Sequence, residues 1–298
     1  MRRRARLAVL VVAFLAVAPP LAAQPLALRP LAVQATPVVY AHRGGAAHAP
    51  ENTMAAFRRA HGLFSARGVW LELDVQATAD GQLVVIHDDS LDRTTDCTGT
   101  VILKTLAEIA PCNAAAHYPG GWPDVVPIPT LREVLTEGNS AGWRLMVEIK
   151  DIPGEANFDA TGMKVADLLV ALIQQTGFPT DRLLVQSFWP LAIDRVEQVA
   201  PRIGTVLLTT SQLPGAPPGV GFTTTENAAF AAVRGYEVAA PDVASIDFSA
   251  TAVSLAHTLG RRVVPWTIDD ARTMQTAAGF GVDGIITNDP DLAYAVLP

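Results

Sequence analysis

Two histidines, an arginine and two acidic residues stand where short apolar runs of the chain end. His42 and Arg43 follow the first run, Glu72 and Asp74 end the second, and His87 ends the third. In a parallel barrel the carboxyl ends of the strands share one rim, and this rim carries the active site. Side chains of these types can bind a cation, hold a phosphate and transfer protons, so their placement predicts an enzyme.

The acidic residues predict a metal site. Glu72 and Asp74 are two positions apart, so on a strand their side chains point to the same face. Glu148 lies near the end of another predicted strand, with Lys150 two positions later. Three carboxylates on one rim would repel one another unless a cation neutralised them, and an all-oxygen set favours Ca2+ or Mg2+ over zinc. Any one of these acids could instead be a solvated charge at a strand end, but the matching positions of all three favour a metal site.

The other candidates concern proton transfer and anion binding. A histidine can give or take a proton at neutral pH, so His42 and His87 are predicted to form an acid–base pair. Arg43 would hold an anionic group by a forked contact, and Lys150 would act as a point charge. Glu51 either belongs to a helix N-terminus or takes part in the site. The remaining histidines lie in predicted loops or helices, where structural or exposed roles are expected: His48, His61, His117 and His257.

Short β-rich runs alternate with helical stretches, which argues for a parallel sheet with helices outside it. The predicted strands are 38–41, 69–75, 83–87, 145–149, 183–187, 205–208, 237–239, 262–266 and 284–287. The predicted helices are 53–67, 131–137, 163–175, 191–199, 228–234, 250–259, 271–278 and 292–296. When one hairpin of 69–75 with 83–87 is set aside, about eight strand–helix units remain, as in a (β/α)8 TIM barrel. A doubly wound open sheet is the alternative, but no Gly-x-Gly-x-x-Gly follows the first strand.

The hydrophobic content and the net charge indicate which classes of molecule this chain can bind. Half of the 298 residues are hydrophobic, enough for one large α/β domain with a full core. The formal net charge is −7, and the first 23 residues hold four arginines and no acid, which leaves about −11 without them. An acidic chain without a basic stripe is a poor candidate for nucleic-acid binding. The expected partner is a small molecule, and nothing in the sequence indicates an oligomeric state.

The N-terminus predicts export. Four arginines are followed by an apolar stretch at 7–18, two prolines and small residues, so 1–23 are predicted to be a signal peptide. A membrane anchor is the alternative, but the apolar stretch is shorter than the roughly 20 residues that span a bilayer. No stable membrane insertion is expected once the signal peptide is removed. Residues 24–36 are predicted to be an extended leader and 37–298 the barrel domain. The predicted location is periplasmic or extracellular.

The chain has two cysteines, Cys97 and Cys112. In an oxidising compartment a pair at this separation is expected to form a disulfide that fixes a surface segment. Free thiols are the alternative. A cysteine-based metal site has no support, because no histidines are spaced near the pair as ligands would be.

The candidate residues together resemble the glycerophosphodiester phosphodiesterase family. The motifs are His42-Arg43-Gly44, Pro50-Glu51-Asn52-Thr53, Glu72-x-Asp74, His87-Asp88 and Glu148-Ile149-Lys150, followed by Gln186-Ser187-Phe188, Pro265-Trp266-Thr267 and 281–287. The resemblance runs from about residue 38 to 295. It implies a TIM barrel with a short insertion near the second to third strands, and a divalent cation at Glu72, Asp74 and Glu148. It also implies His42 and His87 as catalytic residues, Arg43 and Lys150 on the phosphate, and Glu51, Gln186, Phe188 and Trp266 as supporting or substrate-contacting residues.

The sequence departs from the family pattern at two places. Asp269 stands where the family often has asparagine, and Thr287-Asn288-Asp289-Pro290 replaces Thr-Asp-x-Pro. Both positions are expected near the substrate. The segment 88–127 occupies the place of the family's insertion and is expected to form a wall beside the site, in part with Tyr118 and Trp122.

The predicted reaction is hydrolysis of a glycerophosphodiester to glycerol 3-phosphate and an alcohol, with His42 as base and His87 as acid. The resemblance implies that a neighbouring substrate hydroxyl attacks first, giving a cyclic phosphate. A phospholipase of the phosphoinositide-cleaving or sphingomyelinase D kind is an alternative. A glycosidase could use Glu72 and Glu148, but the histidines would then have no task. A non-catalytic barrel that binds a ligand is the alternative outside enzymes.

Overall fold

The computed structural model describes residues 36–212 and 221–298. The predicted signal peptide at 1–23 lies outside these residues, as does the leader at 24–36 apart from its last residue. No helix in these two ranges is long and apolar enough to cross a membrane.

Within the described residues, eight parallel strands form a nearly closed barrel, and a ninth strand pairs with it in an antiparallel hairpin. The strands are β1 (Val38–Ala41), β2 (Trp70–Ala77), β3 (Leu83–Val85), β4 (Leu145–Ile149), β5 (Leu183–Ser187), β6 (Gly204–Thr209), β7 (Val238–Pro241), β8 (Arg262–Val263) and β9 (Gly284–Thr287). The parallel order is β8-β7-β6-β5-β4-β2-β1-β9, and β3 pairs with β2. Hydrogen bonds from Asp283 N to Val263 O (2.9 Å) and from Ile286 N to Pro265 O (3.0 Å) bring the two ends of the sheet together.

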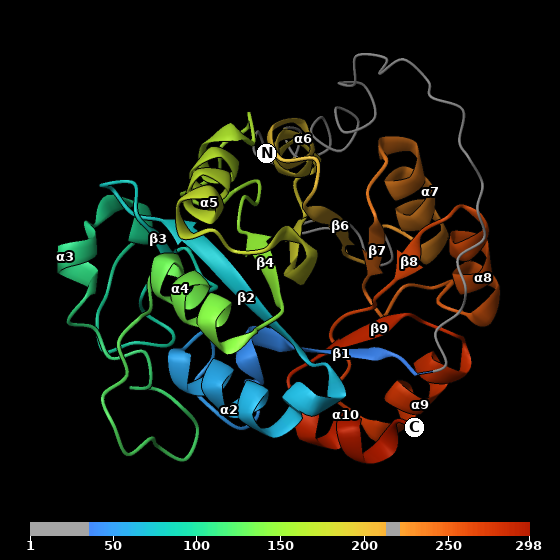
Figure 1. Ribbon diagram of the computed structural model, residues 1–298, viewed down its shortest axis with the longest axis horizontal. Helices are drawn as coiled ribbons and strands as arrows, with labels where there is room; N and C mark the ends of the chain where they lie inside the picture. The colour runs from blue at the N-terminus through green and yellow to red at the C-terminus, as the bar shows by residue number, and fades with distance from the viewer. Residues whose placement is uncertain (1–35, 213–220) are drawn as a thin grey trace, which may run out of the picture.

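The helices form an outer layer around the strands (Figure 1). They are α2 (Met54–Phe64), α3 (Leu106–Ile109), α4 (Leu131–Ala141), α5 (Met163–Thr176), α6 (Pro190–Val199), α7 (Thr224–Arg234), α8 (Ala250–Thr258), α9 (Ala271–Gly279) and α10 (Pro290–Val296). Short 3-10 turns are η1 (His42–Gly44), η2 (Ser65–Arg67), η3 (Val101–Leu103) and η4 (Thr180–Arg182). The helices α2 and α10, the first and last within the described ranges, lie side by side (Figure 1). Arg59 pairs with Asp291 between them.

Local sequence explains where the helices begin and end. Thr130 and Glu133 form a reciprocal capping box at the start of α4, and Gly142 ends this helix with a positive φ of 77°. Thr223 and Glu226 form the same box at α7. These caps satisfy backbone groups that a helix end leaves unpaired.

The core has an inner and an outer part. Inside the barrel, apolar side chains from alternating strand positions meet, among them Tyr40, Met146, Leu184 and Val206. The opposite strand faces pack against the helices in two larger clusters. Because both faces of the strands are buried, the strands are nearly continuous apolar runs, and polar strand residues such as Glu72 stand out.

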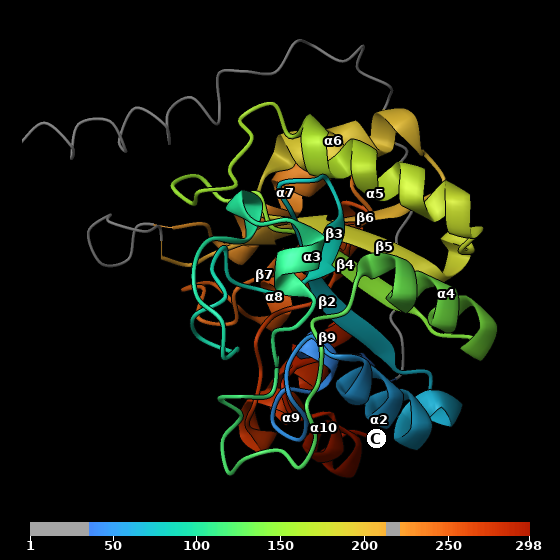
Figure 2. The ribbon, with the colours of Figure 1, turned by 90° about the vertical axis from the view of Figure 1, so that its left-hand side faces the viewer.

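The insertion between β3 and α4 has a small core of its own. Leu91, Val101, Ile109 and Cys112 of the insertion are buried together with Val84 of β3. The Cys97–Cys112 disulfide lies in this segment. Figure 2 shows the insertion as teal and green loops beside α3.

The predicted (β/α)8 barrel with its β2–β3 hairpin is confirmed, with differences in element ends. The predicted strand 262–266 is limited to Arg262–Val263, because Pro265 has no backbone N–H to donate to a ladder. The predicted helix 53–67 ends at Phe64 and continues as a 3-10 turn. The helix α3 was not predicted, since its four residues are too few for a periodic pattern.

Candidate active site

Three buried carboxylates gather near the carboxyl end of β4 and at the neighbouring part of β2, which continues beyond them into its hairpin with β3. Asp74 and Glu148 are direct partners in the parallel register of these strands, and Glu72 lies two residues earlier on β2. One oxygen atom of each acid lies within 4.8 Å of those of the other two. The structure therefore brings together the three acids predicted as metal ligands.

The charges of this acid trio oppose one another. Burial and the neighbouring Asp74 and Glu148 carboxylates raise the pKa of Glu72 well above its ordinary value. Burial also raises the pKa of Glu148, although the Lys150 ammonium opposes the shift. Burial acts in the same direction on Asp74, but Lys150, His87 and Arg43 outweigh it and hold its pKa below the ordinary value. A trio under such repulsion gains from any additional positive charge.

Lys150 supplies one such charge. Its Nζ atom donates to Glu148 Oε1 at 2.7 Å and lies 3.7 Å from Asp74 Oδ1. The same atom donates to His87 Nε2 at 3.0 Å. Burial acts to lower the pKa of Lys150, but Glu148 and Asp74 raise it above its ordinary value, so the side chain stays charged.

The turn after β1 brings Arg43 to the acid trio. Arg43 has a φ of 53°, and its backbone N–H donates to Glu72 Oε2 at 2.8 Å. Gly44 follows with a φ of 83°, and a β-carbon there would lie 2.7 Å from the β-carbon of Ala56. Only glycine fits both conditions. The Arg43 side chain donates to Glu51 Oε1 at 3.0 Å and places its Nε 3.5 Å from Asp74 Oδ2.

Arg93 joins this group from the insertion and was not predicted. Its guanidinium donates to both carboxylate oxygens of Glu51 and to both of Asp88. Glu51 is therefore held between Arg43 and Arg93, in contact with the site as well as near a helix start. No spacing in the sequence marks Arg93, because Glu51, its partner at the site, lies 42 positions away on another loop.

Each of the two histidines is held through its Nδ1 atom. His42 Nδ1 donates to Asn288 Oδ1 at 2.7 Å, and its Nε2 lies 4.0 Å from Glu72 Oε2. His87 Nδ1 donates to Asp88 Oδ1 at 2.6 Å, and its Nε2 accepts from Lys150. Burial and the Arg43 charge lower the pKa of His42 to about 4, so its ring is neutral at neutral pH and can accept a proton.

Two amide side chains orient the acids. Gln186 Nε2 donates to Glu72 Oε1 at 2.9 Å. Asn52 Nδ2 donates to Asp74 Oδ2 at 2.8 Å, and Asn52 Oδ1 accepts from the Asp74 backbone N–H at 3.1 Å. Asn52 was not predicted as a site residue, although the Pro50-Glu51-Asn52-Thr53 motif contains it.

The donor set fits a hard divalent cation. Asp74 Oδ1 is buried and has no hydrogen-bond partner within the described ranges. Lys150 places its ammonium beside Asp74 and Glu148, so the acid trio already stabilises one positive charge. Carboxylate oxygens are the ligands that Ca2+ and Mg2+ prefer.

Aromatic side chains border the site. Phe188 and Trp266 meet edge to face at 5.4 Å between ring centroids, and the Lys150 ammonium lies 5.9 Å from the centre of the Phe188 ring. In the insertion Tyr118 and Trp122 make a similar contact, and Tyr118 Oη donates to Ala47 O at 3.3 Å. Of the two predicted wall residues, Tyr118 thus contacts the loop that follows β1.

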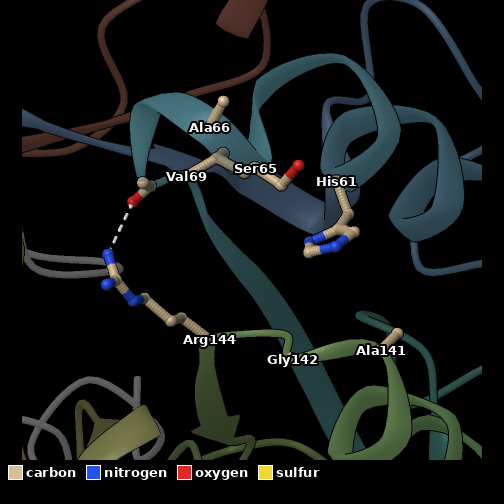
Figure 3. Close-up of a pocket in the computed structure, with 8 residues that line it drawn as sticks. His61, Ser65, Ala66, Val69, Ala141, Gly142 and Arg144 are labelled. Atoms are coloured by element: carbon tan, nitrogen blue, oxygen red, sulfur yellow. Dashed lines mark hydrogen bonds between the residues drawn. The ribbon is translucent and has the colours of Figure 1, made fainter.

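Two other polar features are less suited to chemistry. His48, Asp289 and Asp291 form a second group of metal-ligand type, but Asp289 caps α10 and Asp291 pairs with Arg59. A depression of about 430 Å³ lies at the opposite end of the barrel, where β2 and β4 begin (Figure 3). His61 and Ser65 line one side of it and Ala141 and Arg144 the other, with the carboxyl ends of α2 and α4 beside them (Figure 3). Helix carboxyl ends disfavour anions, so this depression is a poor phosphate site.

Comparison with known proteins agrees with this geometry. The profile of the Glycerophosphoryl diester phosphodiesterase family matches residues 42–292. A glycerophosphodiester phosphodiesterase of Caldanaerobacter subterraneus is 33% identical over 258 residues, covering 85% of this chain and 95% of the relative. A solved structure from Silicibacter pomeroyi DSS-3, described as a proposed glycerophosphoryl diester phosphodiesterase, superposes with a TM-score of 0.75 at 25% identity, covering 91% of this chain and 96% of the other.

A second solved structure adds a ligand. An Oleispira antarctica phosphodiesterase in complex with the product sn-glycerol-3-phosphate superposes with a TM-score of 0.71 at 25% identity, covering 88% of this chain and 96% of the other. The family match covers the rim residues from His42 to Asn288, and the barrel fold is shared. This chain therefore belongs to the glycerophosphoryl diester phosphodiesterase family.

Proposed function

We propose that this protein hydrolyses glycerophosphodiesters to glycerol 3-phosphate and an alcohol, with a divalent cation at its active site. One observation carries the proposal: the acid trio, two basic side chains and two histidines meet at one end of a barrel of this family. The glycerol 3-phosphate bound by the Oleispira antarctica relative supports the same product here.

Glu72, Asp74 and Glu148 would hold the cation, which we propose to be Ca2+ or Mg2+. Bound there, the cation would neutralise charge that grows on the phosphate oxygens during the reaction. Asn52 and Gln186 keep two of the acids in place through their amide groups.

Arg43 and Lys150 are proposed to contact the phosphate. Arg43 offers a planar guanidinium whose Nε is buried and lacks a hydrogen-bond partner among the residues described. Lys150 offers an ammonium that already lies beside the acid trio and His87. Both cations are tied to carboxylates, so they are oriented before substrate arrives.

The two histidines are proposed to move the protons. His42 Nε2 takes the proton of the attacking hydroxyl as that oxygen bonds to phosphorus. His87 must first carry a second proton, on the Nε2 atom that accepts from Lys150 when the ring is neutral, and it gives this proton to the alcohol oxygen as the bond of that oxygen to phosphorus breaks. If the attacker is a neighbouring hydroxyl of the substrate, the product of this step is a cyclic phosphate, and water opens it with the two histidine roles reversed.

The aromatic side chains Phe188 and Trp266 are proposed to contact the organic part of the substrate, because they border the same rim as Lys150.

Residues 1–23 are proposed to be a signal peptide, so that the enzyme acts outside the cytoplasm. The Cys97–Cys112 disulfide supports this placement, since disulfides persist in oxidising compartments.

A substrate panel tests the proposal. Purified protein with Ca2+ or Mg2+ is offered glycerophosphocholine, phosphatidylinositol, sphingomyelin and an aryl glycoside, and each product is measured. Release of glycerol 3-phosphate from glycerophosphocholine, lost in His42→Gln and retained in the matched variant His61→Gln, supports the proposal. Turnover of one of the other substrates alone would assign a different function, and binding without turnover would indicate a non-catalytic barrel.

A further inference from the structure

Two residues outside the predicted catalytic set form a hydrogen-bonded chain that ends at His42. Asp269 follows β8 and Asn288 follows β9, the strand next to β1. Asn288 Nδ2 donates to Asp269 Oδ2 at 2.7 Å, and the Asn288 backbone N–H donates to Asp269 Oδ1 at 2.8 Å. The opposite end of the amide, Oδ1, accepts from His42 Nδ1 at 2.7 Å.

The chemistry of the groups fixes the direction of each bond. A carboxylate only accepts hydrogen bonds, so the Asn288 NH2 group must face Asp269. The amide oxygen is then left to face His42. An amide oxygen is also only an acceptor, so the proton of a neutral His42 ring must sit on Nδ1.

We propose that Asp269 and Asn288 are positioning residues that hold His42 in the Nδ1-protonated form, with Nε2 free to accept a proton. The inference rests on the proposed function, because it concerns the base of that reaction. It identifies the ring atom that acts, and it explains why the amide at position 288 and the carboxylate at position 269 occur together.

The two positions at which the sequence departs from the family pattern, Asp269 and Asn288, therefore form one hydrogen-bonded pair. Asp269 and Asn288 stand where an asparagine and an aspartate are expected, and the structure places them in direct contact. The resemblance implies the same two groups, a carboxylate and an amide, in exchanged positions. His42 here is held by a neutral amide, whereas His87 is held by the Asp88 carboxylate.

The exchange defines a set of variants. In Asn288→Asp two carboxylates face each other across the 2.7 Å contact. In Asp269→Asn the new side chain has only one acceptor oxygen for the two donors of Asn288, its backbone N–H and its Nδ2. The Asn288 amide can then turn and present its NH2 group, instead of its oxygen, to His42. The double variant satisfies every donor again, because Asp at 288 accepts from His42 and from the new amide. Asp270→Asn is the matched control, since asparagine caps a helix as well as aspartate does.

The experiment measures tautomer and kinetics on the same samples. Proton–nitrogen correlation spectra of the 15N-histidine-labelled, Ca2+-loaded protein are expected to show His42 protonated at Nδ1 and bare at Nε2. Each single exchange is expected to disturb this pattern and lower kcat about tenfold or more, with KM changed less. The double exchange is expected to restore the pattern and kcat to within about threefold of wild type, as coupled neighbours do in a double-mutant cycle.

Several outcomes would overturn the proposal: a wild-type His42 protonated at Nε2, single variants with the wild-type pattern and kcat, or a double variant no better than the singles. Poor folding of a single variant alone does not decide the matter, because the double variant then carries the test. The spectra need no turnover, so a wild type that is inactive on glycerophosphodiesters would defeat the proposed function while the tautomer still tests this inference.

Discussion

The ammonium of Lys150 lies 2.7 Å from a carboxylate oxygen of Glu148, which stands two residues earlier, near the end of β4. This contact places a positive charge inside the acid trio and within 3.0 Å of the His87 ring. Lys150 therefore influences metal binding and proton transfer at the same time.

Lys150→Met is expected to bind Ca2+ or Mg2+ more tightly while losing activity. Two charges about 4 Å apart interact by about 4 kcal/mol at an effective dielectric constant of about 20. Removing the ammonium should therefore tighten metal binding by at least about tenfold, and calorimetric titration of the metal-free protein measures this. Lys164→Met, on the exposed face of α5, is the control. Weaker metal binding in Lys150→Met would mean that the trio is not the metal site.

Chelation is expected to abolish activity, and Ca2+ or Mg2+ to restore it. Glu148→Gln removes one ligand charge. The expected loss of metal affinity is roughly 10–100-fold, the size seen when a residue that hydrogen-bonds a metal ligand is removed. Glu137→Gln, whose parent side chain pairs with Arg58 at the surface, should leave the affinity unchanged. Full activity in protein shown by elemental analysis to be free of metal would contradict the prediction.

The two histidines are expected to respond differently to the leaving group. His87→Ala should be slow on glycerophosphocholine, whose alcohol needs a proton, by about 10²–10⁴-fold. The same variant should recover much of its rate on a p-nitrophenyl ester, whose leaving group departs unprotonated. His42→Ala should be slow on both substrates, because the attacking hydroxyl needs its base in each case. Rescue of His42→Ala instead would exchange the two roles, and wild-type rates for both variants would exclude histidine catalysis.

The Cys97–Cys112 disulfide is expected to stabilise the insertion without affecting metal binding. Replacing both cysteines by serine should lower the free energy of unfolding by on the order of 3 kcal/mol, as for a loop of this size. Thermal melts and metal titrations of protein made in an oxidising compartment check both parts. Free thiols in natively purified wild type, detected by mass spectrometry without reductant, would contradict the assignment.

The sequence was sufficient to predict residues that end strands. Glu72, Asp74 and Glu148 interrupt apolar runs, and strands of a parallel barrel must end at one rim, so the pattern alone predicted their convergence. His42 was placed by the same reasoning. His87 follows the antiparallel strand β3, and it reaches the rim because β2 runs on to Ala77 and the hairpin brings β3 back beside Val75.

Contacts made by loops could not be predicted in this way. Arg93 reaches Glu51 over 42 positions, and His42 reaches Asn288 over 246. Such pairs depend on how the insertion folds over the rim and on how the last strand closes beside the first. Lys150 was predicted to face the phosphate, and its spacing places it on the same face as Glu148. The spacing did not indicate that the ammonium would also lie beside Asp74 and His87.

Phosphorus NMR of glycerophosphocholine incubated with the metal-loaded protein tests the central claim most directly. The wild type should convert the diester signal to that of glycerol 3-phosphate. A His42→Ala/His87→Ala double variant with unchanged metal affinity should be slower by at least about 10²-fold. An unchanged diester signal with the metal-loaded wild type, or equal conversion by the double variant, would contradict the assignment of this rim as a glycerophosphodiester-cleaving site.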